Sequence, residues 1–158
     1  MPATDRIVIN PDDFLETEHG RVWTVERNEA AWAWSYAALE QILLQRPRPE
    51  RVVLVCGVQG SGKTSWIASQ PVYPATVYFD AALPGIRHRA RIIAIAKQAD
   101  IPIEAVWIDT PVAIALNRNA RRSVDKIVPE AAILSVARQF EPPSLAEGFA
   151  HILIHKGG

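Results

Sequence analysis

One stretch of eight residues constrains this chain more than any other feature of its sequence. Residues 57–64 read Gly-Val-Gln-Gly-Ser-Gly-Lys-Thr, a complete G-x-x-x-x-G-K-[ST] pattern. The apolar run Val52–Cys56 precedes the pattern, and a helix-compatible segment follows it. In a strand–loop–helix context, glycines let successive backbone N–H groups point at phosphate oxygens, and the helix N-terminus adds a positive dipole. The pattern therefore predicts a loop that binds the phosphates of a nucleoside triphosphate.

The chemistry of such loops assigns a role to individual residues. The lysine reaches the β- and γ-phosphates, and the final hydroxyl ligates magnesium, so we expect these roles for Lys63 and Thr64. The predicted cofactors are ATP and Mg²⁺. No N-K-x-D motif is present, which disfavours a guanine-specific GTPase. The expected nucleotide-binding residues are Gly57, Gln59, Gly60, Ser61, Gly62, Lys63, Thr64 and Ser65, together with Arg118 from a later segment.

Short apolar runs alternate with helical patterns along the chain, which is typical of βαβ units and a parallel sheet. The expected fold is α/β, a three-layer P-loop NTPase or kinase fold with a mainly parallel sheet of about five strands. We expect one domain over residues 1–158. The predicted strands are Arg6–Ile9, Arg51–Cys56, Thr76–Phe79, Ile103–Ile108 and His151–Ile154. The predicted helices are Glu29–Leu44, Lys63–Ser69, Ile86–Ala99, Pro111–Arg121 and Pro129–Gln139, with each proline in a first turn.

Composition excludes several classes of protein. The chain has 158 residues, of which 49% are hydrophobic, and its 17 basic residues balance its 17 acidic ones. This disfavours a disordered chain and a protein that coats nucleic acid through bulk charge. The single Cys56 excludes an internal disulfide. The N-terminal residues do not resemble a secretory signal, and no apolar run approaches about 18 residues, so we expect a cytoplasmic protein with no membrane partner.

Two other apolar runs end in carboxylates. The run Val77-Tyr-Phe ends at Asp80, and Ile7-Val-Ile is followed by Asn10-Pro-Asp12-Asp13. Ligands of open α/β sheets lie outside the carboxyl ends of the strands, so we expect Asp80 to face the magnesium ion. A hydroxyl acceptor needs a carboxylate to orient it and accept its proton, a role open to Asp12. The alternative for these aspartates is a turn or a helix cap.

A basic segment follows in Asn117-Arg-Asn-Ala-Arg-Arg122. Arg118 and Arg122 are four residues apart, so a helix presents both on one face. Phosphoryl transfer spreads negative charge over the equatorial oxygens, and arginine is suited to stabilise that charge. The alternative is a solvated helix end whose cations face the negative end of the helix dipole.

Together these segments resemble the polynucleotide kinase family of P-loop phosphotransferases, whose members move the ATP γ-phosphate to a 5′-hydroxyl end. Gly60–Trp66 is similar to the family's G-S-G-K-[ST]-[ST]-W, and residues 10–13 are similar to its N-x-D-D. The segment 118–122 resembles its lid motif R-N-x-x-R, which V-P follows, here Val128-Pro129. The resemblance covers most of residues 51–140.

The resemblance implies roles for the matched residues. Asp12 would be the general base, Lys63 and Arg122 would stabilise the transferring phosphoryl group, and Arg118 would help close the lid. Asp80 would complete the magnesium site with Thr64. The acceptor would contact Asp13 and Arg89.

Two departures from the family pattern bear on the function. N-x-D-D normally follows the phosphate loop but here precedes it by about 45 residues, which predicts a circular permutation of residues 1–45. Leu15 stands where the family often has a phosphate-gripping arginine, and Ala81 and Ala82 replace polar residues after Asp80. The expected function is an ATP-dependent phosphotransferase with a polynucleotide 5′-hydroxyl as acceptor. The alternatives are a small-molecule kinase and an ATP-binding or ATPase module that acts with a partner.

Overall fold

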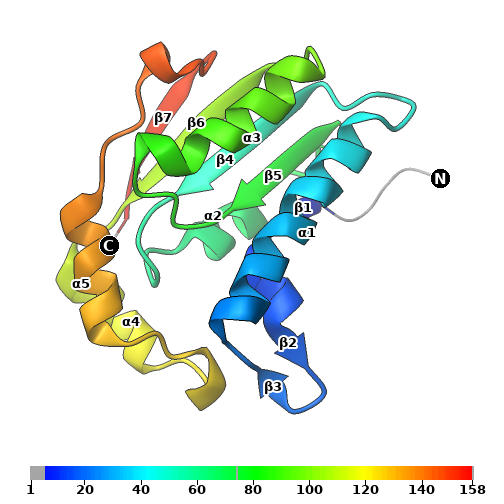
Figure 1. Cartoon of the computed structure of the whole chain (residues 1–158). Helices are drawn as coiled ribbons and strands as arrows, with labels where there is room; N and C mark the ends of the chain where they lie inside the picture. Colours follow the sequence, from blue (N-terminus) through cyan, green and yellow to red (C-terminus); the bar gives the residue numbers. More distant parts are fainter. Residues whose placement is uncertain (1–5, 74, 158) are drawn as a thin grey trace.

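A five-stranded parallel sheet forms the centre of the computed structural model, which describes residues 6–73 and 75–157 (Figure 1). The strand order is β1-β5-β4-β6-β7, and every neighbouring pair is parallel. This confirms the predicted α/β fold. The strands of this sheet are β1 (Ile7–Ile9), β4 (Arg51–Cys56), β5 (Thr76–Asp80), β6 (Ile103–Asp109) and β7 (Ile152–Lys156). A separate antiparallel hairpin consists of β2 (Glu16–Thr17) and β3 (Gly20–Arg21).

Helices cover both faces of the sheet, and two more lie at one end of it (Figure 1). Helices α1 (Val25–Leu43) and α3 (Ile86–Gln98) pack on one face, and α2 (Lys63–Ser69) packs on the other. Helices α4 (Val112–Ala120) and α5 (Glu130–Gln139) pack on each other beside the phosphate loop. Three short 3₁₀ helices complete the described elements: η1 (Pro11–Leu15), η2 (Val124–Lys126) and η3 (Leu145–Glu147).

The central strand β4 shows why the sheet is buried on both sides. Val52 and Leu54 pack in the core under α1 and α3, whereas Val53 and Val55 pack in the core under α2. Successive strand side chains point to opposite faces, so a continuous apolar run suits a strand that helices cover on both faces. This packing on both faces fixes the position of β4 in the sheet. Residues 57–64 therefore begin at its carboxyl end.

Element boundaries differ from prediction for local reasons. Helix α1 begins four residues before the predicted Glu29, because the Thr24 hydroxyl caps it by accepting from the Arg27 backbone N–H at 3.0 Å. Pro111 and Pro129 are N-caps and not first-turn residues, so α4 and α5 each begin one residue later than expected.

The first strand of the chain lies at one edge of the sheet. β1 pairs with β5 so that Ile7 lies beside Val77 and Ile9 beside Phe79. Because β1, β5 and β4 run parallel, their carboxyl ends lie along the same edge of the sheet. Asp80, the last residue of β5, and Asp12, which comes after β1, therefore lie at the edge of the sheet where the phosphate loop begins. Among the described residues, no helix has the length and apolar character needed to cross a membrane.

Candidate functional site

The phosphate loop is a wound segment between β4 and α2. Gly62 is the N-cap of α2 and has a φ of +105°, which a residue with a side chain rarely adopts. The Ser61 carbonyl accepts from Thr110 Oγ1 at 2.7 Å and from Arg118 Nη1 at 3.0 Å. The Lys63 ammonium donates to the Val58 carbonyl at 3.3 Å. The loop is thus held both by its own lysine and by residues that lie about 50 positions later.

At Gly60 the loop passes close to the backbone of α4. The φ of Gly60 is +83°, and a Cβ atom at this position would lie 2.4 Å from the carbonyl oxygen of Ala115 in α4. Left-handed backbone costs a residue with a side chain about 1–2 kcal/mol before this clash is added. We therefore expect Gly60→Ala to weaken nucleotide binding by more than about tenfold, since about 1.4 kcal/mol corresponds to that factor.

Calorimetric titration with a non-hydrolysable ATP analogue checks this prediction, and circular dichroism shows whether the variant remains folded. A folded Gly60→Ala protein with unchanged affinity would mean that nucleotide binding does not need this loop conformation.

Thr64 and Asp80, the two residues predicted to hold magnesium, are hydrogen-bonded to each other. The Thr64 hydroxyl donates to Asp80 Oδ2 at 2.7 Å, and the Asp80 side chain is buried at the end of β5. A hydroxyl and a carboxylate are hard oxygen ligands of the kind that Mg²⁺ binds beside substrate phosphates. These residues therefore fit a magnesium ion, which would be held by Thr64 Oγ1 and the Asp80 carboxylate.

The Lys63 ammonium is the point on which distant charges converge. Burial lowers the pKa of Lys63. The charges of Asp80 and Asp12 raise the pKa of this lysine, and the charge of Arg122 lowers it. These three partners come from β5, from η1 and from the segment after α4. Tertiary structure therefore brings three other predicted site residues within electrostatic range of Lys63.

The carboxylates after β1 lie in a short 3₁₀ helix with a polar cap. Asn10 Oδ1 accepts from the Asp12 backbone N–H at 2.9 Å and so caps η1. Asp12 is ion-paired with Arg21, whose Nη1 lies 3.4 Å from Asp12 Oδ2. Burial raises the pKa of Asp13, and the charges of Asp12, Asp80 and Glu16 also raise it, whereas Arg21 lowers it. The residue that caps η1 is thus Asn10 and neither of the aspartates for which a cap was the alternative. The charge of Asp12 acts on Lys63, and the charge of Asp80 acts on Asp13.

The segment after α4 is fastened by a buried amide. Asn119 Nδ2 donates to the Val128 carbonyl at 2.7 Å, and the Val128 backbone N–H donates to Asn119 Oδ1 at 3.0 Å. Arg118 and Arg122 on either side are exposed, yet Arg118 reaches Ser61 and the charge of Arg122 acts on Lys63. We refer to residues 117–128 as the lid.

The buried position of Arg89 contradicts its predicted acceptor-binding role. Its side chain has 0% exposure, and its guanidinium donates to Glu147 at 2.8 and 3.1 Å and to the Leu83 carbonyl at 2.9 Å. Arg89 lies on the face of α3 that carries the buried Ile92 and Ile93. The helical spacing from these apolar residues could have indicated that Arg89 points inward.

Three further residues hold the site together, and their roles were not predicted from the sequence. Thr110, just after β6, donates to the Ser61 carbonyl of the loop, and Asn119 donates to the Val128 carbonyl at the end of the lid. Arg21, in the hairpin, donates to Asp12. Asn119 is part of the lid motif, so the sequence pointed to this position but not to the hydrogen bonds that its amide makes. Thr110 and Arg21 had no local signal, because their partners are distant in the sequence.

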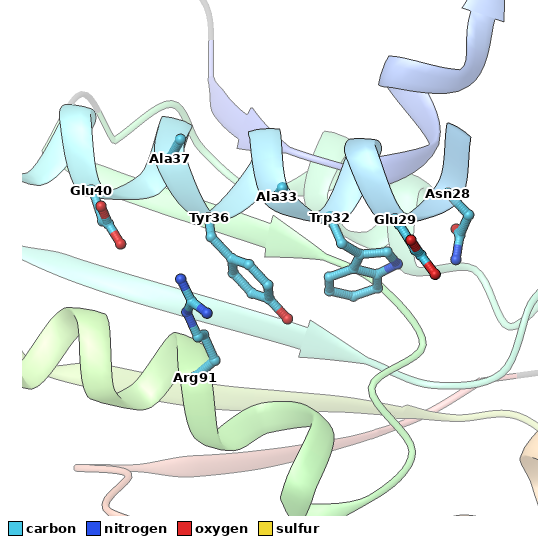
Figure 2. A pocket seen from close by; sticks show the side chains of 8 residues that line it. All are labelled: Asn28, Glu29, Trp32, Ala33, Tyr36, Ala37, Glu40 and Arg91. Atoms are coloured by element: carbon cyan, nitrogen blue, oxygen red, sulfur yellow. The ribbon is translucent and has the colours of Figure 1, made fainter. Parts of the chain in front are cut away.

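A groove of about 490 Å³ lies apart from these residues, between α1 and α3 (Figure 2). Trp32, Tyr36 and Arg91 line it, and the Arg91 guanidinium lies 4.8 Å from the centre of the Tyr36 ring. Trp32 also stacks on Phe79 with ring centres 6.0 Å apart, so it packs the helix on the sheet. The groove does not include the phosphate loop.

Comparison with protein families extends the fold assignment. A family model described as an AAA domain matches residues 73–143. The match runs from β5 to just beyond α5 and includes Asp80, Arg118 and Arg122, but it includes neither residues 57–64 nor Asp12. The match supports a P-loop nucleotide-binding domain of kinase type. The phosphate loop itself rests on its own sequence and geometry, which agree with that assignment.

Proposed function

We propose that this chain is an ATP-dependent phosphotransferase that moves the γ-phosphate of ATP to a hydroxyl acceptor. The observation that carries the proposal is the parallel order β1-β5-β4, which places Asp12, just after β1, at the sheet edge where β4 leads into the phosphate loop. The charges of Asp80, Arg122 and Asp12 all act on the Lys63 ammonium, in agreement with that placement. A nucleotide-binding module needs the loop and the metal ligands alone. Asp12, a further carboxylate whose charge acts on the same ammonium, supplies the group that a hydroxyl acceptor requires.

Each residue has a defined part in the proposed reaction. Asp12 orients the acceptor hydroxyl and takes its proton as the acceptor oxygen bonds to the γ-phosphorus. The bond from the γ-phosphorus to the β,γ-bridging oxygen breaks, and ADP leaves with that oxygen. Lys63 and Arg122 stabilise the charge on the transferring phosphoryl group. Magnesium, when bound at Thr64 and Asp80, neutralises charge on the β- and γ-phosphates.

The sheet order supports the circular permutation. If the strand before the phosphate loop is counted first and β1 second, β5 becomes the third strand and the order across the sheet reads 2-3-1-4-5. In this numbering the N-x-D-D match follows the second strand, as in the family that the chain resembles. We propose that β1 and α1 are the transposed part, because the edge position of β1 makes its place in the chain independent of its place in the sheet.

Two acceptor classes follow from different observations. The resemblance favours a polynucleotide 5′-hydroxyl. The charges near Asp12 favour a small hydroxyl compound, since Arg21 is ion-paired with Asp12 and Glu16, and Arg89 is neutralised by Glu147. Transfer from γ-labelled ATP separates the two classes when 5′-hydroxyl oligonucleotides and a panel of nucleosides and sugars are offered in parallel.

Replacing Asp12 by asparagine tests the proposed base. We expect Asp12→Asn to reduce phosphoryl transfer by about 10²–10⁴-fold, the usual contribution of a general base, with the affinity for ATP nearly unchanged. Transfer from γ-labelled ATP and titration with a non-hydrolysable analogue measure the two quantities. The matched control is Glu18→Gln, which removes a carboxylate that is 86% exposed at the hairpin tip and should leave both unchanged.

Two outcomes would contradict the proposal. Equal transfer by Asp12→Asn and the unaltered protein would exclude Asp12 as the base. ATP hydrolysis without labelling of any acceptor would indicate an ATPase module that acts with a partner.

A further inference from the structure

The hairpin β2–β3 connects two parts of the site that lie about 100 residues apart in the chain. The Arg21 guanidinium donates to Asp12 Oδ2 at 3.4 Å and to Glu16 Oε1 at 3.3 Å, and 17% of this side chain is exposed. The backbone N–H of the same residue donates to Asp125 Oδ2 at 2.8 Å. Arg21 therefore contacts the proposed base through its side chain and the lid through its backbone.

The hairpin tip is shaped to receive Asp125. Gly20 has a φ of +104°, and a Cβ atom there would lie 3.0 Å from Asp125 Oδ2. The hydrogen bond from the Arg21 backbone N–H is the main cause that lowers the pKa of Asp125. An ionised acceptor makes this a charge-assisted hydrogen bond, which is stronger than a neutral one.

The lid end of this contact is tied to the phosphate loop. Asp125 lies in η2, within the segment that the Asn119–Val128 hydrogen bonds close. At the start of the same segment Arg118 donates to the Ser61 carbonyl. A continuous set of contacts thus runs from the phosphate loop through the lid and the hairpin to Asp12.

We propose that Arg21 is a positioning residue that orients Asp12 according to where the lid lies. The acceptor base then reaches its working geometry when the segment carrying Arg118 and Arg122 is seated over the nucleotide. This rests on the proposed phosphotransferase function. The hairpin would then make phosphoryl transfer depend on lid position, because ATP would be activated only with both the lid and the base in place.

Hydrogen exchange tests the coupling without any acceptor. We expect magnesium with a non-hydrolysable ATP analogue to slow exchange of the hairpin amides by about tenfold in the unaltered protein, as seating of the lid stabilises the Arg21–Asp125 bond by about 1.4 kcal/mol. In Asp125→Ala the analogue should still protect the phosphate loop but leave the hairpin unaffected. Equal hairpin protection in both proteins would overturn the proposal.

Steady-state kinetics test the positioning of the base. Asp125→Ala and Arg21→Ala should each lower kcat for transfer about tenfold while the KM for ATP stays constant, and Asp125→Asn should lie between Asp125→Ala and the unaltered protein. Ser123→Ala is the matched control, since Ser123 is exposed in the lid and its side chain makes no capping bond. A change in thermal stability with unchanged kcat would reduce Arg21 to a structural residue and refute the proposal.

The two experiments separate this inference from the proposed function. Coupled exchange without transfer to any acceptor would refute the phosphotransferase and leave the linkage between hairpin and lid standing. A transfer rate that is unchanged in Asp125→Ala would refute the role of the hairpin and leave the phosphotransferase function standing.

Discussion

Lys63→Ala is expected to abolish measurable phosphoryl transfer, with a loss of at least about 10²–10³-fold, the effect of removing one donor aimed at developing charge. Lys63 is the one Lys or Arg among residues 57–64, so the phosphate loop itself has no second cation to replace it. The affinity for ATP should fall as well, because a hydrogen bond to a charged group contributes about 1.5–3 kcal/mol.

Burial of the Lys63 ammonium adds to this expectation. Burial lowers the pKa of Lys63, and a bound triphosphate acts in the opposite direction because its negative charge favours the protonated ammonium. Binding of ATP therefore keeps the ammonium protonated where it is needed, and Lys63→Ala removes this match of charges.

Transfer from γ-labelled ATP and calorimetric titration with the analogue measure the two losses. The matched control is Lys97→Ala, which removes an exposed cation from the last turn of α3. Transfer by Lys63→Ala at the rate of Lys97→Ala would contradict the assignment of residues 57–64 as the catalytic phosphate loop.

Arg89→Ala is expected to destabilise the protein by about 3–5 kcal/mol, the usual cost of breaking a buried ion pair. The Glu147 side chain is only 4% exposed, so its carboxylate would be left buried without its cation. The Leu83 carbonyl would lose its donor at the same time. Because a domain of this size is stable by about 5–15 kcal/mol, the variant should unfold at a markedly lower urea concentration.

Two further variants separate the causes of this loss. Arg87→Ala removes an exposed cation two residues earlier on α3 and should change stability by less than about 0.5 kcal/mol. The double variant Arg89→Met, Glu147→Leu should be more stable than Arg89→Ala, since no unpaired charge remains buried. Normal stability of Arg89→Ala with a raised KM for the acceptor would restore the acceptor-binding role.

Local patterns account for the parts of the fold that sequence analysis predicted. The run Val52–Cys56 is apolar at every position, so it had to be a strand covered on both faces, and the glycines after it had to turn. The loop motif assigned Thr64, and the rule that strand ends meet at one edge of a parallel sheet placed Asp80 beside it. Their hydroxyl and carboxylate oxygens lie 2.7 Å apart.

Contacts between distant segments account for what sequence analysis missed. Arg89 has the same chemistry as an acceptor-binding arginine, and only the packing of α3 turns it toward Glu147. The hairpin that carries Arg21 has strands of two residues each, too short for an alternating pattern to be recognised. Its position depends on Asp125, which is 104 residues away in the chain.

The sequence by itself determined the α/β fold, the phosphate loop and the proximity of Thr64 to Asp80, because each depends on residue types at short spacing or on a rule for strand ends. The tertiary structure alone decided which arginines face the site and how the lid reaches the N-terminal segment. The physical reason is that a charged side chain can be stabilised either by solvent and substrate or by a buried counter-ion. Which of these stabilises a given arginine depends on whether a counter-ion packs against it. That counter-ion is distant along the chain, so no local sequence pattern reveals it.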